Sequence, residues 1–302
     1  VDVSQVDTRV TLLGHEHPFP MLLAPTAYQR LTHPDGDLAT AKGAGAAKAT
    51  LVASIFATHS IEEIAAAATG PLWFQLYTQP DRGLTRDLVQ RAEAAGCEAL
   101  VVTVDTPVLG PRYREIRSKF ALPPGVERSN LKGLAGAAAA HRPTEQSIYS
   151  AVLNPKLTWK DLDWLRSLTQ RPVLLKGVLN PNDAERAVQA GVAGIIVSNH
   201  GGRNMDTQPA TIDALPRIVE RVAGRMPVLV DGGIRRGTDV LKAMALGASA
   251  VLIGRPYLYG LAVDGAAGVT RVINILRREF EMAMATAGRP TIAAIDASVI
   301  WR

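Results

Sequence analysis

The stretch "IIVSNHGGRN" (residues 195–204) joins an apolar run directly to side chains that can move protons and hold anions. His200 has an ordinary pKa near neutrality, so it can act as a base, and a carboxylate such as Asp105 would orient it. Arg203 can hold a carboxylate through two hydrogen bonds. Gly201 and Gly202 let the backbone approach a flat ligand closely. The stretch therefore predicts one site that combines a base with an anion clamp.

Polar residues also end the other apolar runs of the chain. They are Thr26, Ser54, Gln75, Tyr77, Thr103, Asp105, Lys176, Ser198, Asp231 and Arg255. Burying any of these side chains without a hydrogen-bond partner would cost several kcal/mol of folding free energy. For a neutral group the cost is about 2–7 kcal/mol. Taken singly, Gln75 or Thr103 can equally be an interior polar group with its hydrogen bonds satisfied, and Asp231 before two glycines also suits a turn. Lys176 is different, because a buried lysine needs an anionic partner.

The apolar runs themselves predict the elements that position these residues. Eight runs are expected to be strands, at 20–27, 50–55, 72–78, 99–105, 172–178, 194–200, 227–233 and 250–256. Amphipathic helices are expected between them, for instance at 85–95, 182–190, 211–222 and 238–246. Apolar strands that alternate with helices predict a parallel sheet buried on both faces. Eight of them predict an α/β fold of the (β/α)8 TIM-barrel class, whose active site lies at the C-terminal ends of the strands.

An open, doubly wound sheet is the alternative fold, and the absence of a G-x-G-x-x-G motif after the first strand weakens it. The connection at 106–157 is too long for an ordinary loop, and we expect it to be a lid over the strand ends. We expect residues 1–302 to form one domain. The chain begins at Val1 without Met, and we expect that its N-terminal segment is missing.

Two glycine-rich stretches indicate a phosphate-bearing ligand. "VDGGIRRG" (residues 230–237) and "LIGRP" (residues 252–256) follow the seventh and eighth predicted strands, where barrels often bind phosphate. Their glycines expose backbone N–H groups, and Arg235 and Arg255 supply positive charge.

Composition narrows the classes of function. The net charge is +5, but positively and negatively charged residues are mixed along the chain. Nucleic-acid binding is therefore not expected. The single cysteine, Cys97, excludes an internal disulfide and a cysteine-rich metal site, and suggests a reduced thiol in the cytoplasm. Neither an H-E-x-x-H motif nor a membrane-length apolar stretch is present, so we expect no metal and no membrane partner.

Together, these stretches occur in the order typical of one family. The chain resembles the FMN-dependent 2-hydroxy-acid oxidase/dehydrogenase family, which includes glycolate, lactate and hydroxymandelate oxidases and mandelate dehydrogenase. The similarity covers nearly the whole chain. Its motifs are "APTAYQRLTHPDGD", "WFQLY", "TVDTP", "LLKGV", "SNHGGR", "DGGIRRGTDVLKA" and "GRP". "SNHGGR" is the most specific of them.

The resemblance implies a role for each site residue. His200 would be the base and Asp105 its partner, while Tyr77, Arg112 and Arg203 would bind the substrate with His200. Lys176 would stabilise negative charge on the reduced flavin. The implied FMN-binding residues are Pro25, Thr26, Ala27, Ser54, Gln75, Thr103, Lys176, Ser198, Asp231, Gly232, Gly233, Arg235, Gly254 and Arg255.

The resemblance also implies the reaction, which is oxidation of an (S)-2-hydroxy acid to the 2-oxo acid. Ala27 stands where oxidase members tend to have Ala, so O2 is the expected acceptor and H2O2 the expected product. Phe56 and the lid sequence suggest a substrate side chain larger than that of glycolate. Two alternatives stay open: a dehydrogenase that uses a quinone or cytochrome, and a flavin-binding barrel that is inactive because the family's N-terminal segment, with its carboxylate-binding tyrosine, is missing. A homotetramer is expected by analogy with the family.

Overall fold

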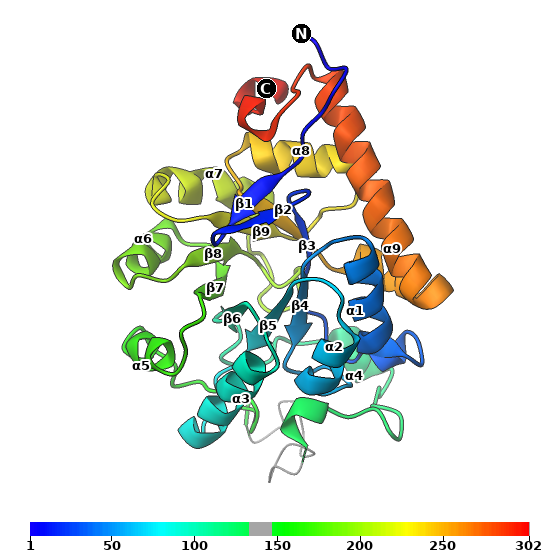
Figure 1. Ribbon diagram of the computed structural model, residues 1–302. Coiled ribbons are helices and arrows are strands. Elements are labelled where there is room, and N and C mark those ends of the chain that lie inside the picture. The colour runs from blue at the N-terminus through cyan, green and yellow to red at the C-terminus, as the bar shows by residue number, and fades with distance from the viewer. Residues whose placement is uncertain (133–146, 302) are drawn as a thin grey trace.

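The computed structural model describes residues 1–132 and 147–301 and contains a closed barrel of eight parallel strands (Figure 1). Strand β10 pairs with both β3 and β9, which closes the sheet and excludes the open alternative. The (β/α)8 prediction is confirmed. The barrel strands, in spatial order, are β10 (Ala250–Ile253), β3 (Met21–Leu23), β4 (Leu51–Ser54), β5 (Leu72–Leu76), β6 (Ala99–Thr103), β7 (Val173–Val178), β8 (Gly194–Val197) and β9 (Val228–Asp231).

Alternate residues of each strand enter two different cores, which is why the strands are apolar throughout. Trp73, Val101 and Leu174 point into the barrel, whereas their neighbours Phe74, Val102 and Leu175 pack under the outer helices. All these side chains are at most 2% exposed. Most strands end two to four residues before the predicted limits, so the polar residues that follow lie on the rim of the barrel.

Apart from α4, which belongs to the connection after β6 and buries no residue, the helices form the outer layer around the barrel (Figure 1). They are α1 (Gly36–Ala46), α2 (Ile61–Ala67), α3 (Arg82–Ala94), α4 (Tyr113–Arg117), α5 (Asp161–Ser167), α6 (Pro181–Gln189), α7 (Thr211–Val222), α8 (Gly237–Ala245) and α9 (Arg255–Thr286). Side-chain caps define several starts: Asp81 accepts from Gly83 N at 2.7 Å, and Ser60 and Glu63 form a capping box on α2. The long α9 contains non-helical backbone at Asp264 and Gly265.

A hairpin of β1 (Val10–Leu12) and β2 (His15–His17) covers the N-terminal end of the barrel. Leu12 packs with the interior core, and His17 is 4% exposed. His17 Nδ1 lies 3.1 Å from Thr50 Oγ1, and no described residue bonds to its Nε2. Asp7 pairs with Thr291, which brings the two terminal segments together (Figure 1). The C-terminal segment adds the short 3-10 helices η3 (Ile292–Ala294) and η4 (Ala297–Val299).

The connection after β6 begins with α4 and reaches a short 3-10 helix, η2 (Ser129–Leu131), before residues 133–146, which lie outside the described residues. The η2 segment is tied to the loop after β4, because Ser129 N donates to Ala57 O at 3.1 Å and Ile61 N donates to Asn130 Oδ1 at 2.8 Å. A lid role for 106–157 stays a prediction.

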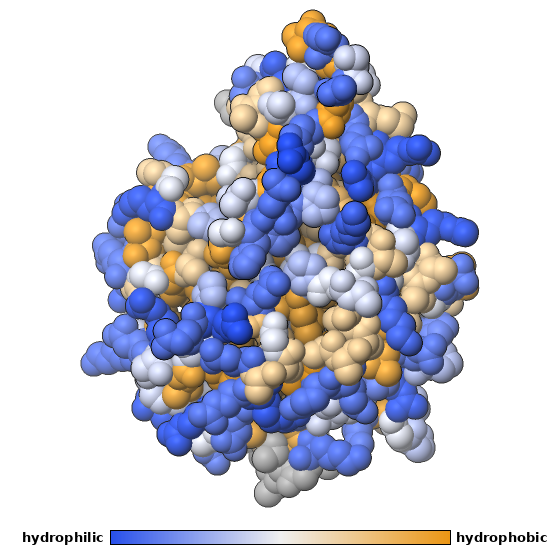
Figure 2. Space-filling model, in the orientation of Figure 1, coloured by the Kyte–Doolittle hydropathy of each residue, from blue (hydrophilic) through white to orange (hydrophobic). Residues whose placement is uncertain are grey.

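Hydrophilic side chains cover much of the face seen in Figure 2, with hydrophobic groups between them. None of the described helices combines the length and the apolar composition that a membrane crossing requires. Cys97 is buried, and burial raises the pKa of its thiol to about 12.

Candidate active site

His200 and Asp105 meet on the rim of the barrel, three residues beyond β8 and two beyond β6. His200 Nδ1 lies 3.0 Å and 3.2 Å from the two carboxylate oxygens of Asp105. Burial alone would raise the pKa of Asp105, but the hydrogen bond from His200 and the charge of Lys176 outweigh it and lower the pKa. An ionised carboxylate at Nδ1 favours the tautomer with its hydrogen there. The other nitrogen, Nε2, is then the proton acceptor.

Two residues that the motifs did not single out hold Asp105. Thr106 Oγ1 donates to Asp105 Oδ1 at 2.9 Å, and Asn204 Nδ2 donates to Thr106 Oγ1 at 2.7 Å and to the Asp105 carbonyl at 3.0 Å. Each stands next to a residue that the sequence did identify, in "TVDTP" and "GGRN". That adjacency was the only available signal.

A bulge in β7 gives Asp105 its place. The register between β7 and β8 shifts between Lys176 and Val178, and Gly177 between them has φ +108°. A Cβ on Gly177 would lie 2.5 Å from Asp105 Cβ and 2.6 Å from Asp105 Cγ. Only glycine fits, because a side chain would overlap with the partner of the base.

Lys176 lies inside the barrel mouth, 5% exposed, and has the anionic partner that its burial requires. Its Nζ is 3.0 Å from Asp231 Oδ2 and donates to Ser198 Oγ at 2.9 Å. Burial alone would lower the pKa of Lys176, but the charges of Asp231 and Asp105 outweigh it and raise the pKa. The lysine is therefore a fixed cation between β7, β8 and β9.

A chain of amides and hydroxyls crosses the neighbouring strand ends. Ser54 Oγ donates to Gln75 Oε1 at 3.3 Å, and Gln75 Nε2 donates to Thr103 Oγ1 at 3.0 Å. These three side chains thus hydrogen-bond to one another, as expected if they were interior polar groups. They also lie beside Lys176 on the same rim of the barrel. Their predicted contacts with a flavin stay a prediction.

The end of β3 is held by Tyr257, which the sequence analysis missed. Its hydroxyl donates to the Ala24 carbonyl at 2.9 Å and makes a very short contact with Thr26 Oγ1. Tyr257 lies in the first turn of α9, right after Gly254 and Arg255. It thereby holds Ala24 and Thr26, on either side of Pro25, in the segment predicted to face a flavin.

The predicted phosphate-binding turns lie next to the His200 loop. Gly232 and Gly233 have φ +92° and +78°, and a Cβ on Gly233 would meet no described atom within 4 Å. Arg235 N donates to Asp239 Oδ2 at 3.0 Å, which orders the turn before α8. A Cβ on Gly201 would lie 3.7 Å from Arg255 Nη2, so Arg255 reaches the glycine that directly follows His200.

The predicted substrate-binding residues lie at the same end of the barrel. The Tyr77 hydroxyl is 3.4 Å from His200 Nε2; burial raises the pKa of Tyr77, Asp105 raises it further, and Arg112 lowers it. Arg203 Nη2 lies 3.7 Å from Glu115 Oε1 in α4, and its side chain is 52% exposed. An incoming carboxylate would have to compete with Glu115 for Arg203.

Comparison with known proteins identifies this arrangement. Over residues 1–302 the sequence matches the family of FMN-dependent dehydrogenases. The chain belongs to this family. It is 50% identical over 307 residues to an L-lactate oxidase from Nostoc sp., covering 99% of this chain and 84% of the relative. It is 46% identical over 302 residues to a glycolate oxidase from Spinacia oleracea, covering 99% and 82%. A crystal structure of mandelate oxidase with (S)-2-phenylpropionate superposes with a TM-score of 0.88 at 44% identity, covering 97% of this chain and 81% of the other.

The resemblance is thus confirmed, and so is FMN as the cofactor of this FMN-dependent dehydrogenase. The described residues fit that cofactor. Asp231 Oδ1 is a buried acceptor that no described residue satisfies, as expected beside a ligand hydroxyl. Gly233 is exposed, and the open space beside it leaves room for a phosphate to approach the backbone of this turn. Lys176 is a buried cation that an electron-rich flavin edge would face.

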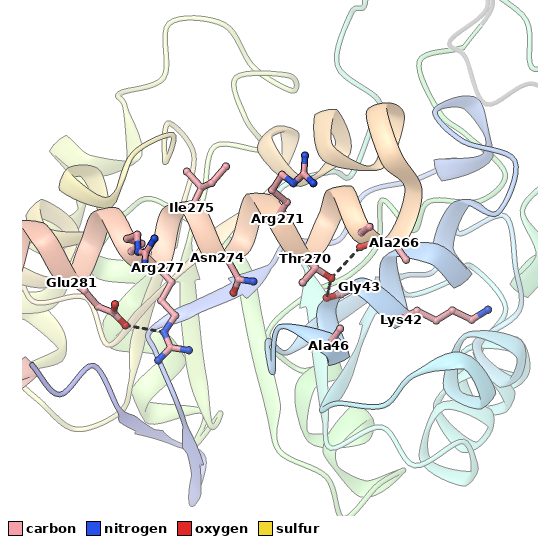
Figure 3. A pocket seen from close by; sticks show the side chains of 12 residues that line it. Lys42, Gly43, Ala46, Ala266, Thr270, Arg271, Asn274, Ile275, Arg277 and Glu281 are labelled. Carbon is pink, nitrogen blue, oxygen red and sulfur yellow. Dashed lines mark hydrogen bonds and ion pairs between the residues drawn. The ribbon is translucent and has the colours of Figure 1, made fainter.

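Two cavities of the described residues differ in their relation to this site. A cleft of about 870 Å³ lies between α1 and α9 and is lined by Lys42, Arg271 and Ile275 among others (Figure 3). None of the predicted site residues lines it. A cavity of about 260 Å³ touches Tyr77, Thr103 and Thr106 at the strand ends. Within the described residues no group of three or more His, Cys, Asp or Glu side chains could hold a metal ion.

Proposed function

We propose that this FMN-dependent enzyme oxidises an (S)-2-hydroxy acid to the 2-oxo acid, with O2 as the electron acceptor and H2O2 as the product. One observation carries the proposal: the His200–Asp105 pair and the Lys176–Asp231 pair share one end of the barrel. The first pair is suited to remove a proton, and the second to stabilise negative charge. The related proteins named L-lactate oxidase and glycolate oxidase support this substrate class and this acceptor.

In this proposal the substrate carboxylate binds Arg203 and Arg112, with Tyr77 beside it. The hydroxyl-bearing carbon then lies near His200 Nε2, the nitrogen that Asp105 leaves free to accept a proton. Asp105 stabilises the imidazolium that forms. FMN, when bound, supplies the two-electron acceptor. Lys176, a permanent cation, offsets the negative charge that arrives with the electrons.

The decisive experiment follows the flavin absorbance of the FMN-loaded protein without oxygen. We expect a 2-hydroxy acid to bleach it and readmitted O2 to restore it with one H2O2 per turnover. Slow reoxidation by O2 with fast reduction of a dye would favour a quinone or cytochrome acceptor instead. Protein that takes up FMN and is bleached by no 2-hydroxy acid would point to an inactive flavin-binding barrel.

His200→Ala tests the base. The variant is expected to bind FMN and to lose about 10²–10⁴-fold in the rate of reduction. His15→Ala changes an exposed histidine of the hairpin and serves as the matched control. Equal reduction rates in both variants would refute the assignment.

The remaining predictions concern the whole molecule. We propose one catalytic domain over residues 1–302, with 106–157 as its lid, and a homotetramer in the cytoplasm. The homotetramer rests on analogy with the family and the location on the buried thiol of Cys97. Light scattering of the FMN-loaded protein tests the homotetramer, and fractionation of the source cells tests the location.

A further inference from the structure

A buried cluster of polar side chains lies behind the segment that is predicted to face the flavin. It consists of Gln29, Thr40 and Tyr257, which are at most 3% exposed and which the proposed chemistry does not use. Gln29 begins the short 3-10 helix η1 (Gln29–Leu31), Thr40 lies in α1, and Tyr257 lies in α9. The cluster therefore connects three elements of the outer layer to Thr26, just beyond the end of β3.

A backbone carbonyl fixes the direction of the hydrogen bonds between Tyr257 and Thr26. The Tyr257 hydroxyl has one hydrogen and donates it to the Ala24 carbonyl at 2.9 Å, because a carbonyl oxygen can only accept. In the very short contact between Tyr257 and Thr26 Oγ1, Tyr257 must then be the acceptor and Thr26 the donor. The hydroxyl hydrogen of Thr26 thus points at Tyr257 and is not free for a ligand.

Gln29 completes the cluster in the one orientation that its partners allow. Its Nε2 lies 3.4 Å from the Thr26 carbonyl oxygen, 3.2 Å from Thr26 Oγ1 and 3.3 Å from the Tyr257 hydroxyl. The carbonyl requires a donor, so the amide nitrogen faces this side and Oε1 faces α1. There Thr40 Oγ1 donates to Gln29 Oε1 at 2.5 Å. The hydroxyl groups of Thr26, Thr40 and Tyr257 thus all have an acceptor within the protein.

The frame behind the cluster is closely packed. Helices α1 and α9 approach each other at Gly43, where a Cβ would lie 2.4 Å from a backbone oxygen of α9. Thr270 Oγ1 in α9 donates to the Gly43 carbonyl at 2.9 Å (Figure 3). Ala24 N donates to the Ile253 carbonyl at 2.8 Å, which fixes the end of β3 to β10. The cluster therefore anchors Thr26 to parts of the fold that are already held in place by their own contacts.

We infer that Gln29, Thr40 and Tyr257 are positioning residues for FMN, which hold the Thr26 hydroxyl on the protein side and so fix the conformation in which residues 25–27 meet the cofactor. Thr26 then offers FMN its backbone and not its hydroxyl. The inference rests on the predicted place of this segment beside FMN, and it does not depend on the proposed substrate or electron acceptor. A segment that adopts its binding conformation only part of the time binds its ligand more weakly by that fraction. The cluster keeps this fraction high before FMN binds.

The test measures the Kd for FMN, from the flavin fluorescence that appears when the FMN-loaded enzyme is diluted and releases its cofactor. Tyr257→Phe removes the acceptor of the Thr26 hydroxyl, and Thr26→Val removes the hydroxyl itself. Each variant should raise the Kd about 3–10-fold, the effect of losing one hydrogen bond that holds the binding conformation. Because both substitutions break the same bond, the double variant should bind FMN about as weakly as the weaker single variant.

Thr40 allows the test to be made from a distance, because its hydroxyl bonds to Gln29 and to no other described residue. Thr40→Val leaves Gln29 Oε1 without a donor and should raise the Kd for FMN about 2–5-fold. Thr40→Ser keeps the hydroxyl and should restore the wild-type Kd. Tyr259→Phe is the matched control for Tyr257→Phe, since Tyr259 lies two positions further along α9 and is 67% exposed. Its Kd should stay within about twofold of the wild type.

Urea unfolding of the FMN-free proteins shows whether the cluster supports only the fold. If Tyr257→Phe, Thr26→Val and Thr40→Val unfold more easily and keep the wild-type Kd, the inference is overturned. A double variant whose Kd rises by the product of the two single effects also overturns it, because Tyr257 and Thr26 would then act separately. If Tyr257→Phe does not fold, the comparison of Thr40→Val with Thr40→Ser decides. The proposed function is unaffected by these outcomes, since anaerobic bleaching by a 2-hydroxy acid tests it separately.

Discussion

Replacing Gly177 by alanine would test how the barrel positions the partner of the base. The added Cβ would lie 2.5 Å from Asp105 Cβ, whereas ordinary contacts begin near 3.4 Å. Asp105 or β7 must therefore move by about 1 Å, because both atoms belong to rigid parts of the chain. The bond of 3.0 Å from His200 Nδ1 to Asp105 cannot survive such a shift without rearrangement.

The size of the effect follows from that bond. A hydrogen bond to a charged group contributes about 1.5–3 kcal/mol. At about 1.4 kcal/mol for each factor of ten, its loss lowers kcat/KM by about 10–150-fold. The left-handed backbone also costs about 1–2 kcal/mol of folding stability once a Cβ is present. The variant should thus be less active and less stable, for two separate reasons.

Gly96→Ala separates these reasons. Gly96 has φ +85°, and a Cβ there would meet nothing within 4 Å. This control therefore carries the backbone penalty alone. Asp105→Asn supplies the second reference, because it weakens the bond to His200 and leaves the backbone of β7 unchanged. Rates of anaerobic flavin reduction and melting temperatures of the FMN-loaded proteins are the measurements.

We expect Gly177→Ala and Asp105→Asn to reduce the flavin at similarly low rates, and Gly96→Ala to match the wild type while it melts at a lower temperature. A fully active Gly177→Ala variant would show that the bulge adapts without moving Asp105, which refutes the reasoning. So would a loss of rate in Gly96→Ala of the same size.

Two further predictions concern buried charges. Burial lowers the pKa of His17 below its ordinary 6.5, so as the pH falls the unfolded chain takes up a proton on this histidine before the folded protein does. Below about pH 6.5 the wild type should therefore lose stability more steeply than His17→Gln. Melting temperatures from pH 8 to pH 5 measure the difference. Lys176→Met should lower the free energy of unfolding of the FMN-free protein in urea by about 3–5 kcal/mol, because it leaves Asp231 buried without its cation. Adding Asp231→Asn should restore most of that stability. If the effects of the two substitutions are additive instead, the pairing is contradicted.

The barrel could be predicted from the sequence because its strands leave a strong signal. A run such as 72–78 is apolar on both faces, and the structure shows why: Trp73 enters the interior core and Phe74 the outer one. The strand ends could not be placed as well. Hydrophobic periodicity does not indicate where the pairing between strands stops. For example, β8 ends at Val197, three residues before the predicted end at His200.

The candidate site was predictable where the chemistry of a residue restricts its use. A lysine in an apolar strand requires an anion, and Lys176 has Asp231 at 3.0 Å. Thr106, Asn204 and Tyr257 carry no such restriction, because a threonine, an asparagine or a tyrosine suits many surroundings. Their contribution depends on which neighbour the fold supplies, and this information is not local.

Gly177 and Arg128 show most clearly that the role of a residue can depend on a neighbour far away in the sequence. A glycine after Lys176 is compatible with any bend, and only the approach of Asp105, 72 positions earlier in the sequence, makes it indispensable. Arg128 lies in a polar connection where arginine is ordinary, yet it donates to a tyrosine 100 residues away. The barrel brings such pairs together because all eight strands end at one rim. The residues that hold this site in place are therefore found at the strand ends and on the loops that meet there, at sequence separations that no motif spans.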